Sequence, residues 1–415
     1  MKKYYDELEV RNPSLREEEQ FSSLSKLMAL AINKAPGWRR ILSGVDPLKI
    51  KNRKDLLLLP VTRKSELQSI QAKEPPFGGL SILDSSSFPH IFASPGPIYE
   101  PGENHDSWRM ARGLYAAGFR KKNIVYNTFS YHLGPAGIMM HQAAHSLGCC
   151  VIAGGVGNTD VQIQTIADLQ PTGYIGTPSF LRILFEKANE NKIDISSLKF
   201  GLVGAEPLPP SLRKLLSEYG IEVLQTYGTA ECGLISYETK DVEGNIIPGM
   251  IVDEGVILEI VRPGTNESLP IGEVGEVVIS TINSNYPMFR FGTGDMSAII
   301  DSKSPCGRTG LRIKGWMGRA DQTTKVRGIF VHPGQVASVA KFYNEIFRFR
   351  LILNNDDNKD QMIFKCEVEK QDSSLQEKIK SSLSSALKLR CEVELVSPGT
   401  LKNDGLVIED CRKYE

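Results

Sequence analysis

The sequence predicts an α/β protein, with a large N-terminal domain of parallel sheets and a β-rich subdomain followed by a small α+β C-terminal lid domain. Three observations predict this class. Strand-like and helix-like segments alternate from about residue 120 to 235, short strand-like segments separated by Pro and Gly follow to about residue 300, and the end of the chain mixes both kinds. Regular alternation is typical of a parallel sheet covered on both faces. The boundary is expected near Asp321, giving domains 1–320 and 321–415.

The first 60 residues have a helical pattern of apolar positions. FSSLSKLMALAINKAPGWRRIL (21–42) carries an apolar stripe that we expect to end near Gly37. LPVTRKSELQSI (59–70) predicts a short strand or turn that leads into a helix, with Thr62 or Ser65 as its N-cap. This region is therefore expected to be helical and to precede the sheet.

The alternating region predicts five strands joined by helices. The ligand-binding edge of such a sheet lies at the carboxyl ends of its strands. Those ends read FSYH, AGG, GTP, VGAEP and YGTAE. We therefore expect the functional residues there.

Composition excludes several classes of function. Lys plus Arg and Asp plus Glu both total 49, so the chain lacks the basic field that nucleic acid or an anionic membrane would need. MKKYYDELEV has no apolar segment after its lysines, and no stretch approaches the ~20 apolar residues of a spanning helix. The seven Cys form neither a disulfide framework nor a metal motif. We expect a reduced, cytoplasmic protein.

Three segments carry residues suited to a nucleotide. In YGTAE (227–231) a hydroxyl is able to hold a phosphate oxygen, and Glu231 is able to bind Mg²⁺. The small residues of VGAEPLPP (203–210) leave room for a flat ring, although a tight strand–helix turn would explain them equally well. In FRFGTGD (289–295) the carboxylate of Asp295 suits two ribose hydroxyls, and the alternative is an ordinary turn Asp.

Three other motifs have competing explanations. GRADQTTKVRG (318–328) combines charge with flanking Gly, which suits a hinge or a solvated charged hairpin. GGVG (154–157) matches a dinucleotide loop only in part. HQAAH (141–145) has Gln where a zinc protease needs Glu and no evident third ligand, so its histidines are expected to pack near the site.

The order of the motifs is more specific than any one of them. LPVTRKSEL, FASPGP, TPSF (177–180), VGAEP, YGTAE, TGD, CGRT and GRADQTTKVRG follow one another over nearly the whole chain. This order resembles the AMP-forming adenylate superfamily, and LPVTRKSEL, VGAEP and CGRT resemble its phenylacetate–CoA ligase-like branch. The resemblance implies that a carboxylate attacks the α-phosphate of ATP to give an acyl-adenylate, and that CoA then displaces AMP.

The resemblance also implies roles for individual residues. Gly204, Ala205 and Glu206 would line the adenine, and Tyr227 with Gly228 would separate adenine from acid. Thr229 would contact the α-phosphate, Glu231 would hold Mg²⁺, and Asp295 the ribose. The remaining roles are nucleotide contact for Arg319, hinge for Asp321, and acid pocket for Phe129, Tyr131 and His132. Such ligases are often dimers, so a homodimer is expected by resemblance only.

Two segments depart from the family pattern. The phosphate loop resembles SSGTTGKP in the family, whereas here residues 93–101 read ASPGPIYEP. Ser94 and Gly96 remain, but both prolines lack an N–H and Glu100 would repel a phosphate. In GTLKNDGLVIED (399–410), Leu406 stands where the family has a catalytic Lys, and Lys402, four residues away, is the candidate to take over its catalytic role if the loop bends.

The departures leave three functions open. The first is an acyl- or aryl-CoA ligase that activates a small, aromatic carboxylate with ATP, Mg²⁺ and CoA. The second is a ligase homologue without adenylation that binds an aryl ligand, an adenylate or a CoA ester. The third is a transferase that uses a pre-made adenylate or thioester with a partner protein. Because both losses concern the phosphates of ATP, we expect the site to bind adenylates better than it makes them.

Overall fold

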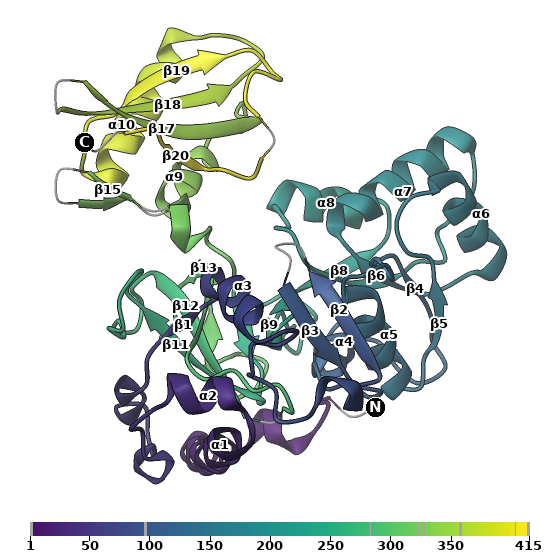
Figure 1. Cartoon of the computed structure of the whole chain (residues 1–415). Coiled ribbons are helices and arrows are strands. Elements are labelled where there is room, and N and C mark those ends of the chain that lie inside the picture. Colours follow the sequence, from purple (N-terminus) through teal and green to yellow (C-terminus); the bar gives the residue numbers. More distant parts are fainter. Residues whose placement is uncertain are drawn as a thin grey trace. The chain divides into compact units, whose positions relative to one another are not determined.

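The computed structural model describes residues 3–94, 98–282, 284–322, 324–326, 329–331, 333–356, 359–402 and 404–412. Its fold consists of two compact units (Figure 1). The first comprises Met1–Val261, Thr265–Thr293 and Ala298–Gly315, and the second comprises Arg262–Gly264, Gly294–Ser297 and Trp316–Glu415. The domain boundary at residues 320 and 321 stays a prediction, and each unit is described by itself.

An eight-stranded sheet organises the first unit. The five strands expected from the sequence run parallel, and three further strands extend the sheet antiparallel beyond β8. In spatial order the strands are β14 (Arg312–Ile313), β10 (Met250–Val252), β9 (Gly233–Tyr237), β8 (Glu222–Thr229), β7 (Phe200–Val203), β6 (Gly173–Gly176), β4 (Ile124–Asn127) and β5 (Cys150–Ala153).

Helices cover both faces of the parallel part, as the alternation predicts. Successive strand residues point to opposite faces, so Val125 packs with the helices α4 and α5 while its neighbour Tyr126 packs with α6, α7 and α8. Figure 1 shows these helices around the sheet. Their bounds are α4 (Met110–Ala116), α5 (Ala136–Ser146), α6 (Thr159–Leu169), α7 (Pro178–Asn191) and α8 (Pro210–Glu218).

A second, four-stranded sheet forms the β-rich part, in the order β1-β13-β12-β11. β11 and β12 are antiparallel, whereas β1 from the N-terminal region joins β13 in parallel. The sequence did not predict this parallel addition. The strands are β1 (Thr62–Arg63), β11 (Val256–Val261), β12 (Gly275–Thr281) and β13 (Phe291–Ser297).

The N-terminal region is helical, with two corrections to the sequence prediction. The long helix ends at Lys34 rather than near Gly37, because Pro36 starts a new helix. The N-cap of α3 is Arg63 rather than Thr62 or Ser65, and the Glu66 carboxylate accepts a hydrogen bond from its backbone N–H. The helices are α1 (Pro13–Lys34), α2 (Pro36–Ile41) and α3 (Lys64–Lys73), with 3₁₀ turns η1 (Glu7–Val10), η2 (Pro47–Lys49), η3 (Asp55–Leu58) and η4 (Ser85–Ser87).

A separate hairpin carries the segment in which the sequence predicts an altered phosphate loop. Its strands β2 (His90–Ser94) and β3 (Ile98–Gly102) pair antiparallel, with Ser94 opposite Ile98. Residues 95–97 lie outside the described residues, so the prediction for Gly96 falls there.

The second unit has the α+β composition that the sequence predicts. Its four-stranded sheet has the order β19-β18-β17-β20, and α9 and α10 contribute to the same core. The elements are η5 (Ala320–Gln322), β15 (Thr324–Val326), β16 (Ile329–Val331), α9 (Pro333–Ala340), β17 (Arg348–Asp356), β18 (Lys359–Glu367), α10 (Ser373–Leu387), β19 (Glu392–Val396) and β20 (Ile408–Asp410).

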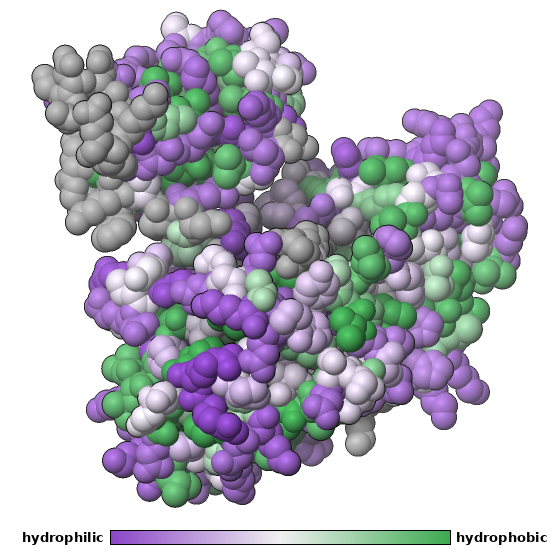
Figure 2. All heavy atoms as spheres, in the orientation of Figure 1, coloured by the Kyte–Doolittle hydropathy of each residue, from purple (hydrophilic) through white to green (hydrophobic). Residues whose placement is uncertain are grey.

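The surface shows no segregation of polar and apolar side chains on the face drawn in Figure 2, where the two kinds are interspersed. Within the described part of the chain, none of the helices has the length and apolar character that crossing a membrane requires.

Candidate functional site

The segment 204–206 is fixed at the carboxyl end of β7 by two neighbouring strands. A side chain at Gly204 would clash with Thr226 on β8, since its Cβ would lie 2.9 Å from Thr226 Cγ2. Ala205 has a φ of +65°, which is uncommon for a residue other than glycine. Such backbone strain clusters at ligand sites. The backbone here is thus held close to β8.

Glu206 connects this segment to the helix that follows β6. Its Oε1 accepts a hydrogen bond of 2.6 Å from the backbone N–H of Ser179, in the first turn of α7. A carboxylate is favourable there because the N-terminal N–H groups of a helix carry partial positive charge. The Gln225 amide donates to the Glu206 carbonyl at 3.1 Å. The TPSF and VGAEP motifs therefore meet at one edge of the sheet, next to β8 just before YGTAE.

β8 ends in a register shift that positions the next residues. The pairing of β8 with β9 is irregular between Tyr227 and Gly228. The Tyr227 hydroxyl donates to Thr293 Oγ1 at 3.3 Å, which links YGTAE to FRFGTGD. A Cβ at Gly228 would lie 2.6 Å from the Gly233 carbonyl oxygen, so the close strand approach requires glycine. Thr229 Oγ1 accepts from the Cys232 N–H at 3.2 Å.

Glu231 is buried and forms an ion pair that the sequence prediction missed. Its Oε1 lies 2.8 Å from Lys64 Nζ at the start of α3. The Glu231 side chain is 0% exposed and that of Lys64 is 28% exposed. Burial opposes the charged form of Lys64, but the Glu231 carboxylate raises its pKa above the ordinary value.

The hairpin holds Ser94 and Glu100 together. Ser94 Oγ donates a hydrogen bond of 2.6 Å to Glu100 Oε1. Glu100 is 1% exposed, and its Oε2 has no hydrogen-bond partner among the described residues. Burial raises the pKa of Glu100 to about 8. Burial thus favours the uncharged form of this acid, and the expectation that Glu100 would repel a phosphate stays a prediction.

The predicted acid-pocket residues differ in their environment. Phe129 is half-buried and packs against the core beneath β4. The Tyr131 hydroxyl accepts from the Asn127 amide at 2.8 Å and lies 3.3 Å from His141 Nδ1. Burial raises the pKa of Tyr131 to about 12. The side chain of His132 is exposed, so the structure groups Tyr131 with His141 rather than with His132.

Within the second unit, Asp295 and Arg319 face each other. Arg319 Nη1 lies 3.3 Å from Asp295 Oδ1, and the Trp316 indole N–H donates to the same oxygen at 3.0 Å. The structure thus joins the predicted ribose ligand to the predicted nucleotide contact. Asp321 lies in η5, and its role as the hinge stays a prediction.

The segment in which the sequence predicts that the family Lys is missing is held by two residues of the same unit. The Arg350 guanidinium donates to the Lys402 carbonyl at 3.1 Å and forms an ion pair with Asp404. Gln322 Oε1 accepts from the Val407 N–H at 2.8 Å. Leu406 is 38% exposed, and the Lys402 side chain is exposed.

Comparisons with known proteins identify the family of the chain. A model described as AMP-binding enzyme matches residues 105–284, and a model for the AMP-binding enzyme C-terminal domain matches residues 328–406. Phenylacetate-coenzyme A ligase of Thermus thermophilus is 29% identical over 383 residues, covering 88% of this chain and 84% of that protein. The Pseudomonas putida enzyme of the same name is 28% identical, covering 96% and 94%. The chain belongs to the AMP-forming adenylate superfamily, in its phenylacetate–CoA ligase-like branch.

A solved structure supports the fold of this superfamily member. An open conformation of 2-hydroxyisobutyryl-CoA ligase in complex with 2-HIB-AMP and CoA aligns with a TM-score of 0.83 at 22% identity. The alignment covers 99% of this chain and 95% of that one. The predicted fold class is confirmed, with parallel sheets and a C-terminal domain.

Glu231 fits one part of a magnesium site. Carboxylate oxygens are preferred Mg²⁺ ligands, and Glu231 Oε2 has no hydrogen-bond partner within the described residues. No group of three or more His, Cys, Asp or Glu in those residues is arranged to hold a metal ion. Phosphate oxygens and water would therefore supply the other ligands, as is common for Mg²⁺. The role of Glu231 stays a prediction.

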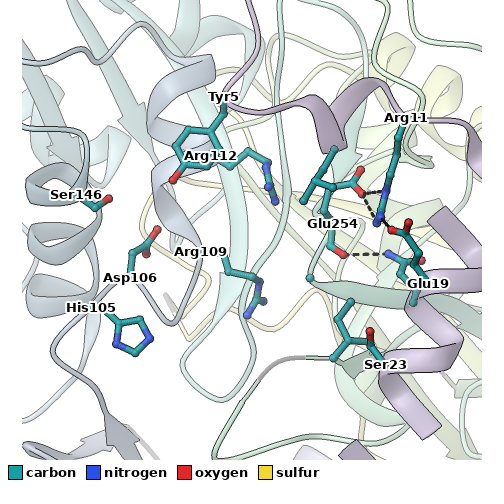
Figure 3. Close-up of a pocket in the computed structure, with 14 residues that line it drawn as sticks. Tyr5, Arg11, Glu19, Ser23, His105, Asp106, Arg109, Arg112, Ser146 and Glu254 are labelled. Carbon is teal, nitrogen blue, oxygen red and sulfur yellow. Dashed lines mark hydrogen bonds and ion pairs between the residues drawn. The ribbon is translucent and has the colours of Figure 1, made fainter. Parts of the chain in front are cut away.

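A cavity of about 510 Å³ between the N-terminal region, α4 and the segment around Glu254 is lined by another residue that the sequence prediction missed (Figure 3). Arg109, at the N-terminal end of α4, lines this cavity and donates to the carbonyls of Cys232 and Leu234 at 2.7 and 3.1 Å. Its Nε lies 2.7 Å from Asp253 Oδ1. Arg109 thus fixes the chain just after Glu231, and no sequence motif indicates this role.

Proposed function

We propose that this chain is an AMP-forming acid–CoA ligase whose substrate is a small, aromatic carboxylate. In the first step, a carboxylate oxygen attacks the α-phosphorus of ATP and pyrophosphate leaves. In the second step, the CoA thiolate attacks the acyl carbon, and AMP leaves as the thioester forms. Bound Mg²⁺ would neutralise phosphate charge in the first step.

One observation carries the proposal. Hydrogen bonds join the segment 204–206, which the resemblance assigns to the adenine, to the TPSF segment through Ser179 and to β8 just before YGTAE through Gln225. The Tyr227 contact with Thr293 adds a fourth segment. Gly204, Ala205 and Glu206 would line the adenine, Tyr227 and Gly228 would form the wall beside the acid, and Thr229 would contact the phosphate. The named ligand of the structural relative, 2-HIB-AMP, is an adenylate and supports this assignment.

The aromatic acid is supported by the side chains at the end of β4. Phe129 and Tyr131 provide aromatic surface next to α5, and the paired Tyr131 hydroxyl and His141 ring add polar groups. The curated relatives named phenylacetate-coenzyme A ligase also suggest an aryl acid.

The test is ATP–pyrophosphate exchange across a panel of aryl and short acyl acids. The acid that supports the fastest exchange would identify the substrate. Formation of its thioester with CoA would then demonstrate the second step. A second assay supplies the acyl-adenylate and CoA directly, which bypasses the altered segments. A protein that is folded but inactive in both assays, with every acid, would contradict the ligase proposal.

A second candidate is a homologue that binds an adenylate or CoA ester without adenylating. It is favoured by Leu406, which has no charge to offer, and by Ser94, whose hydroxyl is already bonded to Glu100. Activity in the second assay without exchange in the first would indicate that only adenylation has been lost. Tight adenylate binding without activity in either assay would indicate a binding protein.

A further inference from the structure

Lys64 brings a positive charge into the candidate site. The family pattern does not assign this residue to either of the two lysine positions that have been lost. The loop 93–101 has Glu100 where the family has Lys, and the segment 399–410 has Leu406 where it has another. Lys64 enters the site from a third segment, at the start of α3. Its ammonium contacts Glu231 at 2.8 Å.

The position of Lys64 is unfavourable for a helix alone. The N-terminal end of a helix carries partial positive charge, so a lysine there is disfavoured. A residue that breaks a local rule often does so for a functional reason. Here Glu231 compensates part of the cost, because the carboxylate is buried and needs a cation.

Helix α3, which carries Lys64, also holds the β2–β3 hairpin. Lys64, Leu67 and Gln71 share one face of α3. The Gln71 side chain binds the backbone of Tyr99 twice, donating to its carbonyl at 2.7 Å and accepting from its N–H at 2.9 Å. Tyr99 precedes Glu100, so α3 fixes the hairpin and presents Lys64 from the same surface.

The surrounding charges leave Lys64 able to take an anion. Glu100, which is buried with Ser94 bonded to one oxygen, is kept uncharged by its surroundings. Glu231 is then the one carboxylate that contacts the ammonium in the described residues. The Lys64 side chain is 28% exposed, whereas Glu231 is not exposed at all. An ammonium has three donors, so Lys64 is able to keep Glu231 and bind a phosphate oxygen.

We infer that Lys64 neutralises the phosphate charge of a bound adenosine phosphate in this chain, in place of the lysines absent from 93–101 and 399–410. The inference rests on the proposed function, because it assumes that the nucleotide site at β7 and β8 is occupied. The ligand class is an adenosine monophosphate or an acyl-adenylate, each with an anionic phosphate.

The experiment compares AMP with adenosine, which lacks the phosphate. Affinities are measured by calorimetry for the wild type, Lys64→Met and Lys64→Arg, in EDTA so that no metal supplies charge. The matched control is Lys73→Met, an exposed lysine in the last turn of the same helix. The measured quantity is the ratio of AMP affinity to adenosine affinity, which cancels changes that affect folding or the adenine pocket.

We expect Lys64→Met to lower this ratio about 10- to 100-fold, the usual range for a charge-assisted hydrogen bond. Lys64→Arg should restore part of it, and Lys73→Met should leave it unchanged. An unchanged ratio in Lys64→Met would overturn the inference while leaving the proposed function intact. A wild type that binds neither ligand would overturn both, since the nucleotide site itself would then be absent.

Discussion

The two halves of the candidate site differ in how they are built. At the ends of β7 and β8, the hydrogen bonds of Glu206 and Tyr227 connect different segments of the fold, which are those proposed to line the adenylate. At the hairpin, Ser94 and Glu100 bond to each other within one short element. If the proposed function holds, this difference predicts that holding an adenylate and making one depend on separable residues.

The largest expected effect comes from placing a positive charge at position 406, in the segment 399–410. Leu406→Lys should raise ATP–pyrophosphate exchange by about 10²–10³-fold, because the new ammonium would stabilise charge that develops in the first step. Leu406→Met is the control, since it keeps an apolar side chain of similar size. An exchange rate that is equal in both variants would show that the hairpin limits adenylation by itself.

The hairpin is tested by Glu100→Gln and the pH dependence of stability. A buried acid with a raised pKa binds its proton more tightly when folded, so it costs stability as pH rises from about 4.5 towards about 8. Glu100→Gln removes this ionisation. Its stability relative to the wild type should therefore increase by on the order of 1–4 kcal/mol between pH 5 and pH 9.

Urea unfolding at several pH values measures this difference. Glu66→Gln on α3, whose carboxylate is exposed and bonded to the Arg63 N–H, serves as the control for removal of an acid. A Glu100→Gln difference that does not change with pH would show that Glu100 ionises normally.

The adenylate-lining region is tested by Glu206→Ala. The substitution leaves the Ser179 N–H without its acceptor at the start of α7, so the free energy of unfolding should fall by about 1–2 kcal/mol. Adenosine affinity should fall as well, because the 204–206 backbone loses an anchor. Glu186→Ala, on the exposed part of the same helix, controls for loss of a surface carboxylate. Unchanged adenosine affinity would contradict the assignment of this segment to the adenine.

The smallest effect is expected for Lys402→Met. The Lys402 side chain is exposed and only its carbonyl is held, so the substitution should change exchange by no more than about 2-fold. Exchange assays of the Leu406→Lys background with and without Lys402→Met give the most sensitive comparison. A large loss of exchange would indicate that Lys402 supplies catalytic charge, and it would weaken the case for Lys64.

Much of the fold was predictable because its signals are local. The alternation of strands and helices and the order of the motifs indicated the sheet and its ligand-binding edge. The break before Pro36 was missed although proline is a local signal, because the apolar stripe continues through it to Leu42. The parallel pairing of Thr62 with Phe291 was not predicted because the two strands are distant in the sequence.

The pairing within the site was less predictable than its motifs. Lys64 is part of LPVTRKSEL and Glu231 part of YGTAE, but nothing in either motif indicates that they contact. Likewise, Glu100 looked repulsive in the sequence because burial and the Ser94 bond are three-dimensional properties. A lysine at the first position of a predicted helix was the one available signal, since that position normally disfavours it.

The double hydrogen bond between Gln71 and Tyr99 has a mechanical consequence. Two turns of α3 separate Gln71 from Lys64, so one helix supports both the β2–β3 hairpin and the ammonium that contacts Glu231. The hairpin and the buried ion pair therefore depend on the same support, and a substitution that shifts α3 should alter both.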